Sequence, residues 1–194
     1  MAAVPVTVFS DFACPFSYVT EAALRRMAAA DGEVETAHLA WELYPAPAPL
    51  PPEDAGEWLD ALRPLADELG LPLRVPAPVR TRKAHEAAAF AAARGAGPAM
   101  REALFAAHFA RGRDIGRIDV LVEIGAGVGL DASELKVVLD VDAFAARVAA
   151  EQEAGRGAGV QGVPTVVVGT GDQARWLVGA RPYAELRAAV LGGE

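Results

Sequence analysis

The chain has 194 residues, of which 53% are hydrophobic and 23% charged; 18 Lys and Arg against 26 Asp and Glu give a net charge of −8. This composition provides enough apolar surface for a packed core and excludes an intrinsically disordered chain. An isoelectric point near 4.9, with no basic stretch longer than residues 80–83, argues against a nucleic-acid partner, which would need clustered positive charge.

No targeting or membrane-spanning segment is expected from the hydropathy of the chain. Residues 1–9 carry neither a basic stretch nor an apolar core of the length of a secretory signal. Charged residues, glycines and prolines interrupt every Ala-rich stretch before it reaches the roughly 18 apolar residues that a membrane span needs. We therefore expect a soluble, cytoplasmic protein with no membrane partner.

The first part of the chain predicts a strand, a helix and a second strand. Residues 4–9 are rich in β-branched and aromatic side chains, which favours a strand. A helix is expected from near Pro15 to residue 30, because apolar residues recur there at spacings of three and four. Alternating residues over 33–44 predict the second strand, and the proline-rich stretch 45–52 ends it.

The middle of the chain is predicted to be almost entirely helical. Apolar residues at helical spacing dominate from residue 54 to residue 155, with glycines at the breaks. Pro98 stands where a first-turn proline belongs, and residues 131–134 have the spacing of a capping box. About a hundred residues of this chain are therefore expected to form helices.

The last part returns to strands and closes with a helix. Strands at 163–168 and 174–178, joined by a turn at 169–172, predict a β-hairpin, and Pro182 opens the final helix. A strand pattern that is interrupted by helices and then resumed favours an α/β fold with one mixed sheet and a large helical insertion. The predicted division is a sheet domain of residues 1–53 and 156–194 and a helical insertion of residues 54–155.

Cys14 is the only cysteine, so the chain can form neither an internal disulfide nor a cysteine-based metal cluster, and no metal site is expected. With Pro15 as the first helical residue, Cys14 takes the N-cap position, where free backbone N–H groups stabilise a thiolate. We therefore expect a reactive thiol with a lowered pKa. The alternative is a buried, inert cysteine that acts as a small hydrophobic residue.

Ser17 lies one helical turn after Cys14, so its hydroxyl is expected to face the sulfur and to donate a hydrogen bond to a thiolate or to a ligand sulfur. Its alternative role is to satisfy the start of the helix. His38 and His108 fit a strand alternation and an apolar helix face, and we interpret both as structural residues.

Three motifs together resemble the DsbA-type thioredoxin-like superfamily: Val-Phe-Ser-Asp-Phe at 8–12, Cys-Pro-Phe-Ser at 14–17 and Gly-Val-Pro-Thr at 162–165. The resemblance is strongest to FrnE-like oxidoreductases and to the group of kappa-class glutathione transferases and 2-hydroxychromene-2-carboxylate isomerases. It covers nearly the whole chain and implies a thioredoxin-like fold.

The resemblance also implies roles for individual residues. Val163 and Pro164 would form a cis peptide beside Cys14, and Val163 would present backbone groups to the substrate. Pro15, Phe16 and Pro164 would contact substrate as well. Residues 82–85 resemble a FrnE-like motif whose histidine lies on an insertion helix, so His85 is a further substrate-binding residue, with a solvated helix position as its alternative.

The glutathione site of kappa-type members resembles the turn at 178–181, so Val163, Ala180 and Arg181 are the cofactor-binding residues that the resemblance implies. Two departures stand out. Ser17 replaces the second cysteine that releases substrate from a dithiol enzyme, and Ala180 and Arg181 replace the hydroxyl and acidic residues that hold the γ-glutamyl end of glutathione.

The sequence therefore predicts a thiol–disulfide oxidoreductase that works as a monothiol enzyme through Cys14, tuned by Ser17. Its partners would be disulfide- or thiol-containing substrates, either proteins or glutathione, with glutathione as a cofactor that is not obligatory. Related folds often dimerise, so a homodimer is also considered. A cleft between the sheet domain and the insertion would select the substrate, with four candidate lining residues: Phe12, Phe16, Trp41 and His85. All four could instead be core or surface residues, and core packing is the favoured role of the three aromatic ones.

Two alternatives remain from the sequence. One is a glutathione-dependent isomerase or transferase, in which Cys14 or Ser17 orients the sulfur of glutathione without forming a disulfide. The other is a non-catalytic binding module that kept the fold and lost the dithiol.

Overall fold

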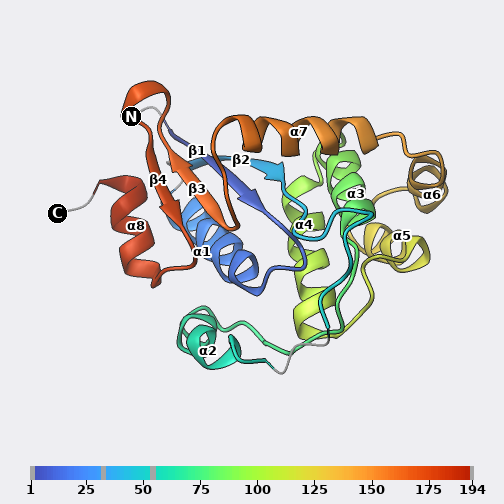
Figure 1. Cartoon of the computed structure of the whole chain (residues 1–194), viewed down its shortest axis with the longest axis horizontal. Helices are drawn as coiled ribbons and strands as arrows, with labels where there is room; N and C mark the ends of the chain where they lie inside the picture. Colours follow the sequence, from blue (N-terminus) through green and yellow to red (C-terminus); the bar gives the residue numbers. More distant parts are fainter. Residues whose placement is uncertain (1–2, 32–33, 53–55, 193–194) are drawn as a thin grey trace.

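A four-stranded mixed sheet forms the centre of the computed structural model, which describes residues 3–31, 34–52 and 56–192 (Figure 1). The strand order is β2-β1-β3-β4; β1 pairs with β2 in parallel and with β3 antiparallel, and β3 and β4 form the antiparallel hairpin predicted from the sequence. The strands are β1 (Val4–Ser10), β2 (Val34–Ala40), β3 (Thr165–Val168) and β4 (Arg175–Val178).

Two helices cover one face of this sheet, where residues two apart on β1 (Val6 and Val8) and on β3 (Val166 and Val168) point the same way and are buried. α1 (Pro15–Asp31) and α8 (Tyr183–Leu191) pack on that face. The resulting core joins β1 and β3 to both helices: Val6, Val8, Val166, Val168, Ala23, Leu24, Met27, Leu186 and Val190.

α7 (Ala145–Gly157) lies across the opposite face, where Phe9 and Trp41 form a smaller apolar cluster with Val160. Gly155 permits this close approach: a Cβ there would lie 2.9 Å from the Phe9 ring and 3.0 Å from the Trp41 ring. α7 also contacts β2 and α3, so this one helix links the sheet to the inserted helices.

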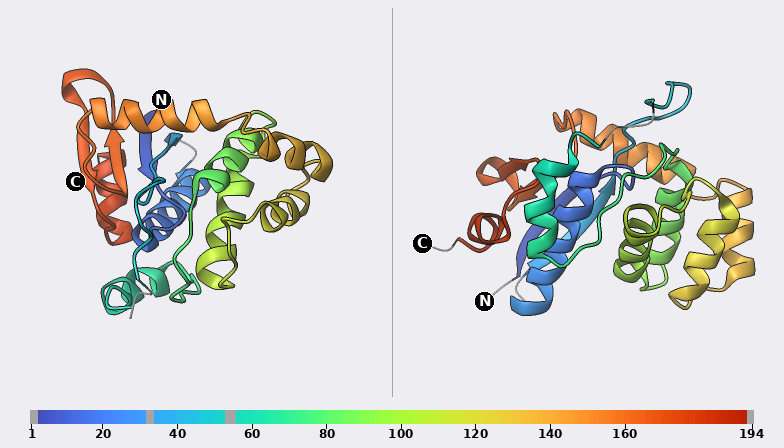
Figure 2. Two further views of the ribbon diagram at one scale, coloured as in Figure 1. Left: turned by 45° about the vertical axis from the view of Figure 1, so that its right-hand side comes forward. Right: turned by 90° about the horizontal axis from the view of Figure 1, so that it is seen from below.

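The inserted helices form the second body visible beside the sheet in Figure 2. They pack around an aromatic core that includes Phe90, Phe105 and Phe109. The Asp131 carboxylate caps one of them by accepting the Glu134 N–H at 2.8 Å, as the capping-box spacing predicted. The elements are α3 (Arg82–Ala92), α4 (Gly97–Phe105), the π-helical turn η1 (Ala106–Ala110), α5 (Ile118–Gly127) and α6 (Ala132–Asp140).

The structure corrects two predicted strand boundaries and one segment of the predicted helical region. β2 ends at Ala40 rather than at residue 44, and β3 begins only at Thr165, directly after Pro164. Residues 71–81 lie within the region predicted to be almost entirely helical but contain no helix, because three prolines there remove N–H donors and prevent a helical turn. α2 (Leu59–Glu68) packs against α1 of the sheet body. The division of the chain at residues 53 and 156 stays a prediction.

No helix in the described part of the chain combines the length and the apolar character needed to cross a membrane.

Candidate active site

Cys14 stands at the N-terminus of α1, as the Cys-Pro dipeptide predicted. Its carbonyl accepts the first helical hydrogen bond, from the Tyr18 N–H at 3.1 Å, and its own N–H donates to the Asp11 carbonyl at 3.0 Å. Pro15 is the first helical residue and has no N–H that would need a partner. A tight turn after β1 therefore delivers the thiol to the beginning of the helix.

The Cys14 sulfur is enclosed by the protein rather than presented on its surface. The residue is 4% exposed, and its thiol donates a hydrogen bond to the Val163 carbonyl at 3.4 Å. The peptide between Val163 and Pro164 is cis, as the family resemblance implied. The Cys14–Pro15 motif after β1 and the cis Val163–Pro164 peptide before β3, which are far apart in the sequence, thus meet at the Cys14 sulfur.

The expected lowering of the Cys14 pKa is wrong. Burial raises the pKa of the thiol, because a thiolate loses its hydration in this position. Hydrogen bonds from the Ser17 hydroxyl and from the N–H groups of Ser17 and Phe16 act in the opposite direction but do not outweigh burial. A thiol that donates to a carbonyl is also, by that contact, protonated.

Ser17 faces Cys14 from the first turn of α1, as its spacing predicted, and is completely buried. Its hydroxyl oxygen also accepts the Asp11 N–H at 3.4 Å. Ser17 therefore contacts the sulfur and also supports the turn that precedes the helix.

A cavity of about 600 Å³ opens beside Cys14. Its walls come from the start of α1, the proline-rich segment after β2, the first residues before α2, the extended segment before α3 and the π-helical turn η1. The lining residues are mostly apolar: Ala13, Cys14, Pro15, Phe16, Leu43, Tyr44, Pro51, Pro52, Glu57, Trp58, Val75, Pro76, Ala77, Pro78, Val79, His108 and Phe109.

Of the four residues expected to line the cleft, only Phe16 lies in this cavity. Phe12 is fully buried against Phe105 in the aromatic core, and Trp41 packs with Phe9 under α7. Core packing, the role favoured for the aromatic residues, is therefore confirmed for Phe12 and Trp41, large apolar rings whose burial contributes to folding.

His85 is also buried, away from the lining of the Cys14 cavity. Its Nε2 lies 3.3 Å from the Asp11 carboxylate, and its ring lies 4.8 Å from that of Phe12. The same carboxylate accepts the N–H groups of Ala13 at 3.3 Å and Leu43 at 2.7 Å. His85 therefore holds the turn that carries Cys14 and is not the solvated residue that was its alternative.

Ala180 and Arg181, which the kappa-type resemblance placed at glutathione, are also absent from the lining of this cavity. Ala180 packs on the cluster of Val19 and Leu62 between α1 and α2. The Arg181 guanidinium pairs with Glu185, one turn further along α8. The structure thus brings Cys14, Pro15, Phe16, Ser17 and Val163 together and leaves His85, Ala180 and Arg181 outside.

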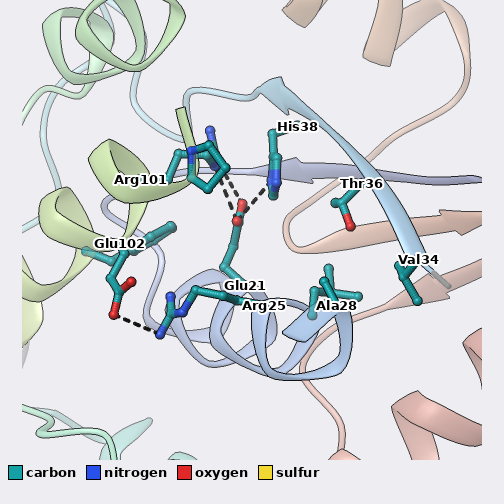
Figure 3. Close-up of a pocket in the computed structure, with 11 residues that line it drawn as sticks. Glu21, Arg25, Ala28, Val34, Thr36, His38, Arg101 and Glu102 are labelled. Carbon is teal, nitrogen blue, oxygen red and sulfur yellow. Dashed lines mark hydrogen bonds and ion pairs between the residues drawn. The ribbon is translucent and has the colours of Figure 1, made fainter. Parts of the chain in front are cut away.

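A second polar cluster lies between α1, β2 and α4, beside a smaller cavity of about 190 Å³ (Figure 3). The buried Glu21 carboxylate pairs with Arg101, approaches His38 Nδ1 at 3.0 Å and accepts the Ser10 hydroxyl at 2.6 Å. The charges of Arg101 and His38 outweigh the effect of burial and hold the Glu21 pKa well below its usual range. His38, interpreted as structural, thus belongs to a buried ion network.

The amino-acid sequence of residues 5–191 matches the family described as the DSBA-like thioredoxin domain. The chain belongs to this family. The resemblance seen in the sequence motifs is therefore confirmed, together with the thioredoxin-like fold and its helical insertion.

Two relatives of this DSBA-like protein match most of its length. YwbO of Bacillus subtilis, an uncharacterized protein, is 31% identical over 86% of this chain and 87% of its own. A probable DsbA oxidoreductase from Streptomyces coelicolor is 29% identical, with a TM-score of 0.82 over 98% of this chain and 91% of that one.

Two more distant structures share the fold. A 2-hydroxychromene-2-carboxylate isomerase is 23% identical, with a TM-score of 0.78 over 97% of this chain and 94% of that one. The cytosolic disulfide reductase DsbM of Pseudomonas aeruginosa, solved with glutathione, is 20% identical, with a TM-score of 0.72 over 97% of this chain and 98% of that one.

Most residues that line the Cys14 cavity in this DSBA-like protein were not expected from the sequence. His108 lines the Cys14 cavity, although its place on an apolar helical face indicated a structural role. The only signal in the sequence was an imidazole on that apolar face, which does not show what the face covers. Among the described residues, no group of three or more His, Cys, Asp or Glu is arranged to hold a metal ion.

Proposed function

We propose that this DSBA-like protein is a monothiol enzyme of thiol–disulfide exchange and that Cys14 is its nucleophile. The observation that carries the proposal is the position of the Cys14 sulfur, at the N-terminus of α1, 3.4 Å from the Val163 carbonyl and on the wall of a 600 Å³ cavity. Cavities of about 300–1,000 Å³ hold small ligands. An enclosed sulfur therefore favours a small disulfide over a folded protein as substrate.

The proposed reaction has two exchange steps. The Cys14 sulfur attacks one sulfur of the substrate disulfide, so that one S–S bond forms as the other breaks and a thiolate leaves. An external thiol then attacks the mixed disulfide and regenerates Cys14, because Ser17 cannot act as a second thiol. We propose glutathione as this external thiol; its presence in the structure of DsbM supports the choice.

Mass spectrometry of the purified full chain tests the proposal. After incubation with glutathione disulfide, we expect one glutathione adduct, on Cys14, that reduced glutathione removes. Cys14→Ser should abolish the adduct, whereas Ser17→Ala, a matched change one turn away, should retain it. If the wild-type protein forms no adduct with glutathione disulfide or with a small aromatic disulfide, the proposed exchange function is wrong.

A second variant tests whether the site lacks only the second thiol. Ser17→Cys places a thiol where dithiol members of the fold carry theirs, so we expect this variant, unlike the wild type, to form an internal disulfide with Cys14 and to release a second equivalent of thiol from a small disulfide. Cys14→Ser combined with Ser17→Cys is the control and should be inactive. Equal activity of the single and double variants would contradict a nucleophilic role for Cys14.

The alternative is a glutathione-dependent isomerase or transferase, and one observation favours it. The Cys14 thiol is buried and donates a hydrogen bond. A protonated thiol of this kind can hold the sulfur of glutathione by a hydrogen bond without forming a disulfide. This alternative predicts that reduced glutathione binds in calorimetry, that Cys14→Ser retains this binding, and that glutathione disulfide leaves no adduct. The exchange function predicts the adduct.

A further inference from the structure

His108 stands on the π-helical turn η1, which continues α4 into the wall of the Cys14 cavity. π-helical turns are rare and frequently occur at functional sites. The residue is 2% exposed, and its ring lies 4.8 Å from that of Phe109. Phe109 in turn stacks on Tyr18 of α1 at 5.4 Å, so two ring contacts connect the imidazole to the helix that carries Cys14.

The protonation of the imidazole follows from its one hydrogen bond. His108 Nδ1 lies 3.2 Å from the Arg113 carbonyl oxygen. A carbonyl can only accept, so Nδ1 carries the proton and donates it. In the neutral ring Nε2 is then an acceptor, and it has no hydrogen-bond partner within the described parts of the chain. Burial lowers the His108 pKa, which favours this neutral form.

The chemistry of Cys14 requires such an acceptor. The thiol is protonated where it lies, since it donates to the Val163 carbonyl, and only a thiolate attacks a disulfide efficiently. Some group must therefore remove the proton in or before the attack. Among the described residues that line the cavity, His108 alone presents an imidazole.

We propose that His108 is the general base of the thiol chemistry at Cys14. This inference rests on the proposed exchange function. Nε2 takes the proton of the thiol as the sulfur bonds to the nearer sulfur of the disulfide, the substrate S–S bond breaks, and the imidazolium returns the proton to the departing thiolate. No electrons are gained or lost by the pair of reactants, because one disulfide replaces another.

The charged groups around His108 allow this cycle. Asp11 and Asp114 stabilise the imidazolium and raise the His108 pKa, but burial, the larger effect, keeps it below the usual value. Arg113 turns its guanidinium to Glu123. The other titratable groups on the cavity wall are Glu57, Tyr44 and Cys14 itself.

The test measures the rate at which Cys14 reacts with 4,4′-dithiodipyridine, a small aromatic disulfide, between pH 6 and 10. General bases typically contribute at least about a hundredfold. We therefore expect His108→Gln to react about a hundredfold more slowly at pH 7. The difference should shrink as the pH rises through the thiol pKa, because a thiolate formed by solvent needs no base. Imidazole in solution should restore part of the rate of His108→Ala.

His38→Gln is the matched control, since it makes the same change in a histidine outside this cavity, and it should react like the wild type. If His108→Gln reacts as fast as the wild type, or more slowly by the same factor at every pH, His108 is not the base, whereas the exchange function stands. If wild-type Cys14 does not react at any pH, the exchange function itself fails.

Nitrogen NMR of the folded wild-type protein decides the question independently of any variant. We expect a neutral His108 at pH 7 with its proton on Nδ1. A proton on Nε2, or a charged imidazolium at this pH, would overturn the assignment even if the His108 variants do not fold.

Discussion

Replacing Glu21 by Gln should remove a large part of the stability of this protein, although the two side chains have nearly the same shape. The Glu21 carboxylate is buried and pairs with Arg101, His38 Nδ1 and the Ser10 hydroxyl (Figure 3). The neutral amide leaves the guanidinium of Arg101, itself 8% exposed, as an uncompensated buried charge. Losing one partner of a buried pair costs about 3–5 kcal/mol, out of a total of roughly 5–15 kcal/mol for a typical domain.

Equilibrium unfolding in urea at pH 7 measures this loss, and the same cavity wall provides its control. Glu102 pairs with Arg25 at 3.3 Å, but their side chains are 54% and 39% exposed. Because water screens an exposed pair, Glu102→Gln should change the free energy of unfolding by less than about 1 kcal/mol. If Glu21→Gln costs no more than Glu102→Gln, burial does not set the strength of this network.

The pH dependence gives a second measurement of the same network. Since the folded state holds the Glu21 pKa below its usual value, its carboxylate contributes stability that is fully present above the unfolded pKa and is lost as the pH falls toward the folded one. The difference between wild type and Glu21→Gln should therefore be largest above about pH 5 and shrink below it. A difference that stays constant down to pH 3 would refute this assignment.

Two further predictions concern α7 and α6. Gly155→Ala should destabilise the protein by about 1–3 kcal/mol, because the new Cβ would lie 2.9–3.0 Å from the Phe9 and Trp41 rings. Gly157→Ala is the control, because a Cβ at residue 157 would have no atom within 4 Å. It should leave stability unchanged or raise it by up to about 1 kcal/mol. Thermal melts of the two variants compare them directly, and equal melting temperatures would contradict the contact. Asp131→Ala should cost about 0.5–2 kcal/mol in urea unfolding, because the Glu134 N–H loses its acceptor; no loss would mean that water replaces the cap without cost.

Much of the fold could be predicted because its signals are local. The β-branched and aromatic run of residues 4–9, the proline after Cys14 and the capping box at Asp131 are each signals of neighbouring residues, and each element formed where its pattern indicated. The cis peptide at Val163 was implied by the family resemblance and not by these local signals.

The errors arose where distant segments meet. The N-terminus of a helix favours a thiolate, but the proline-rich segment after β2 and the extended segment before α3 enclose the same sulfur, and the loss of water outweighs the effect of the helix. His85 and His108 both lie on helical segments with apolar neighbours. Only the packing of the insertion against α1 turns one toward Asp11 and the other toward the cavity.

The sequence by itself therefore determined the order of the strands and helices, the family and the proposed nucleophile, because periodicity, caps and motifs are properties of neighbouring residues. The tertiary structure decided the protonation of Cys14, the lining of its cavity and the partners of each histidine. Desolvation and long-range charge pairing depend on what surrounds a group in space, and residues about a hundred positions apart in the chain provide those surroundings.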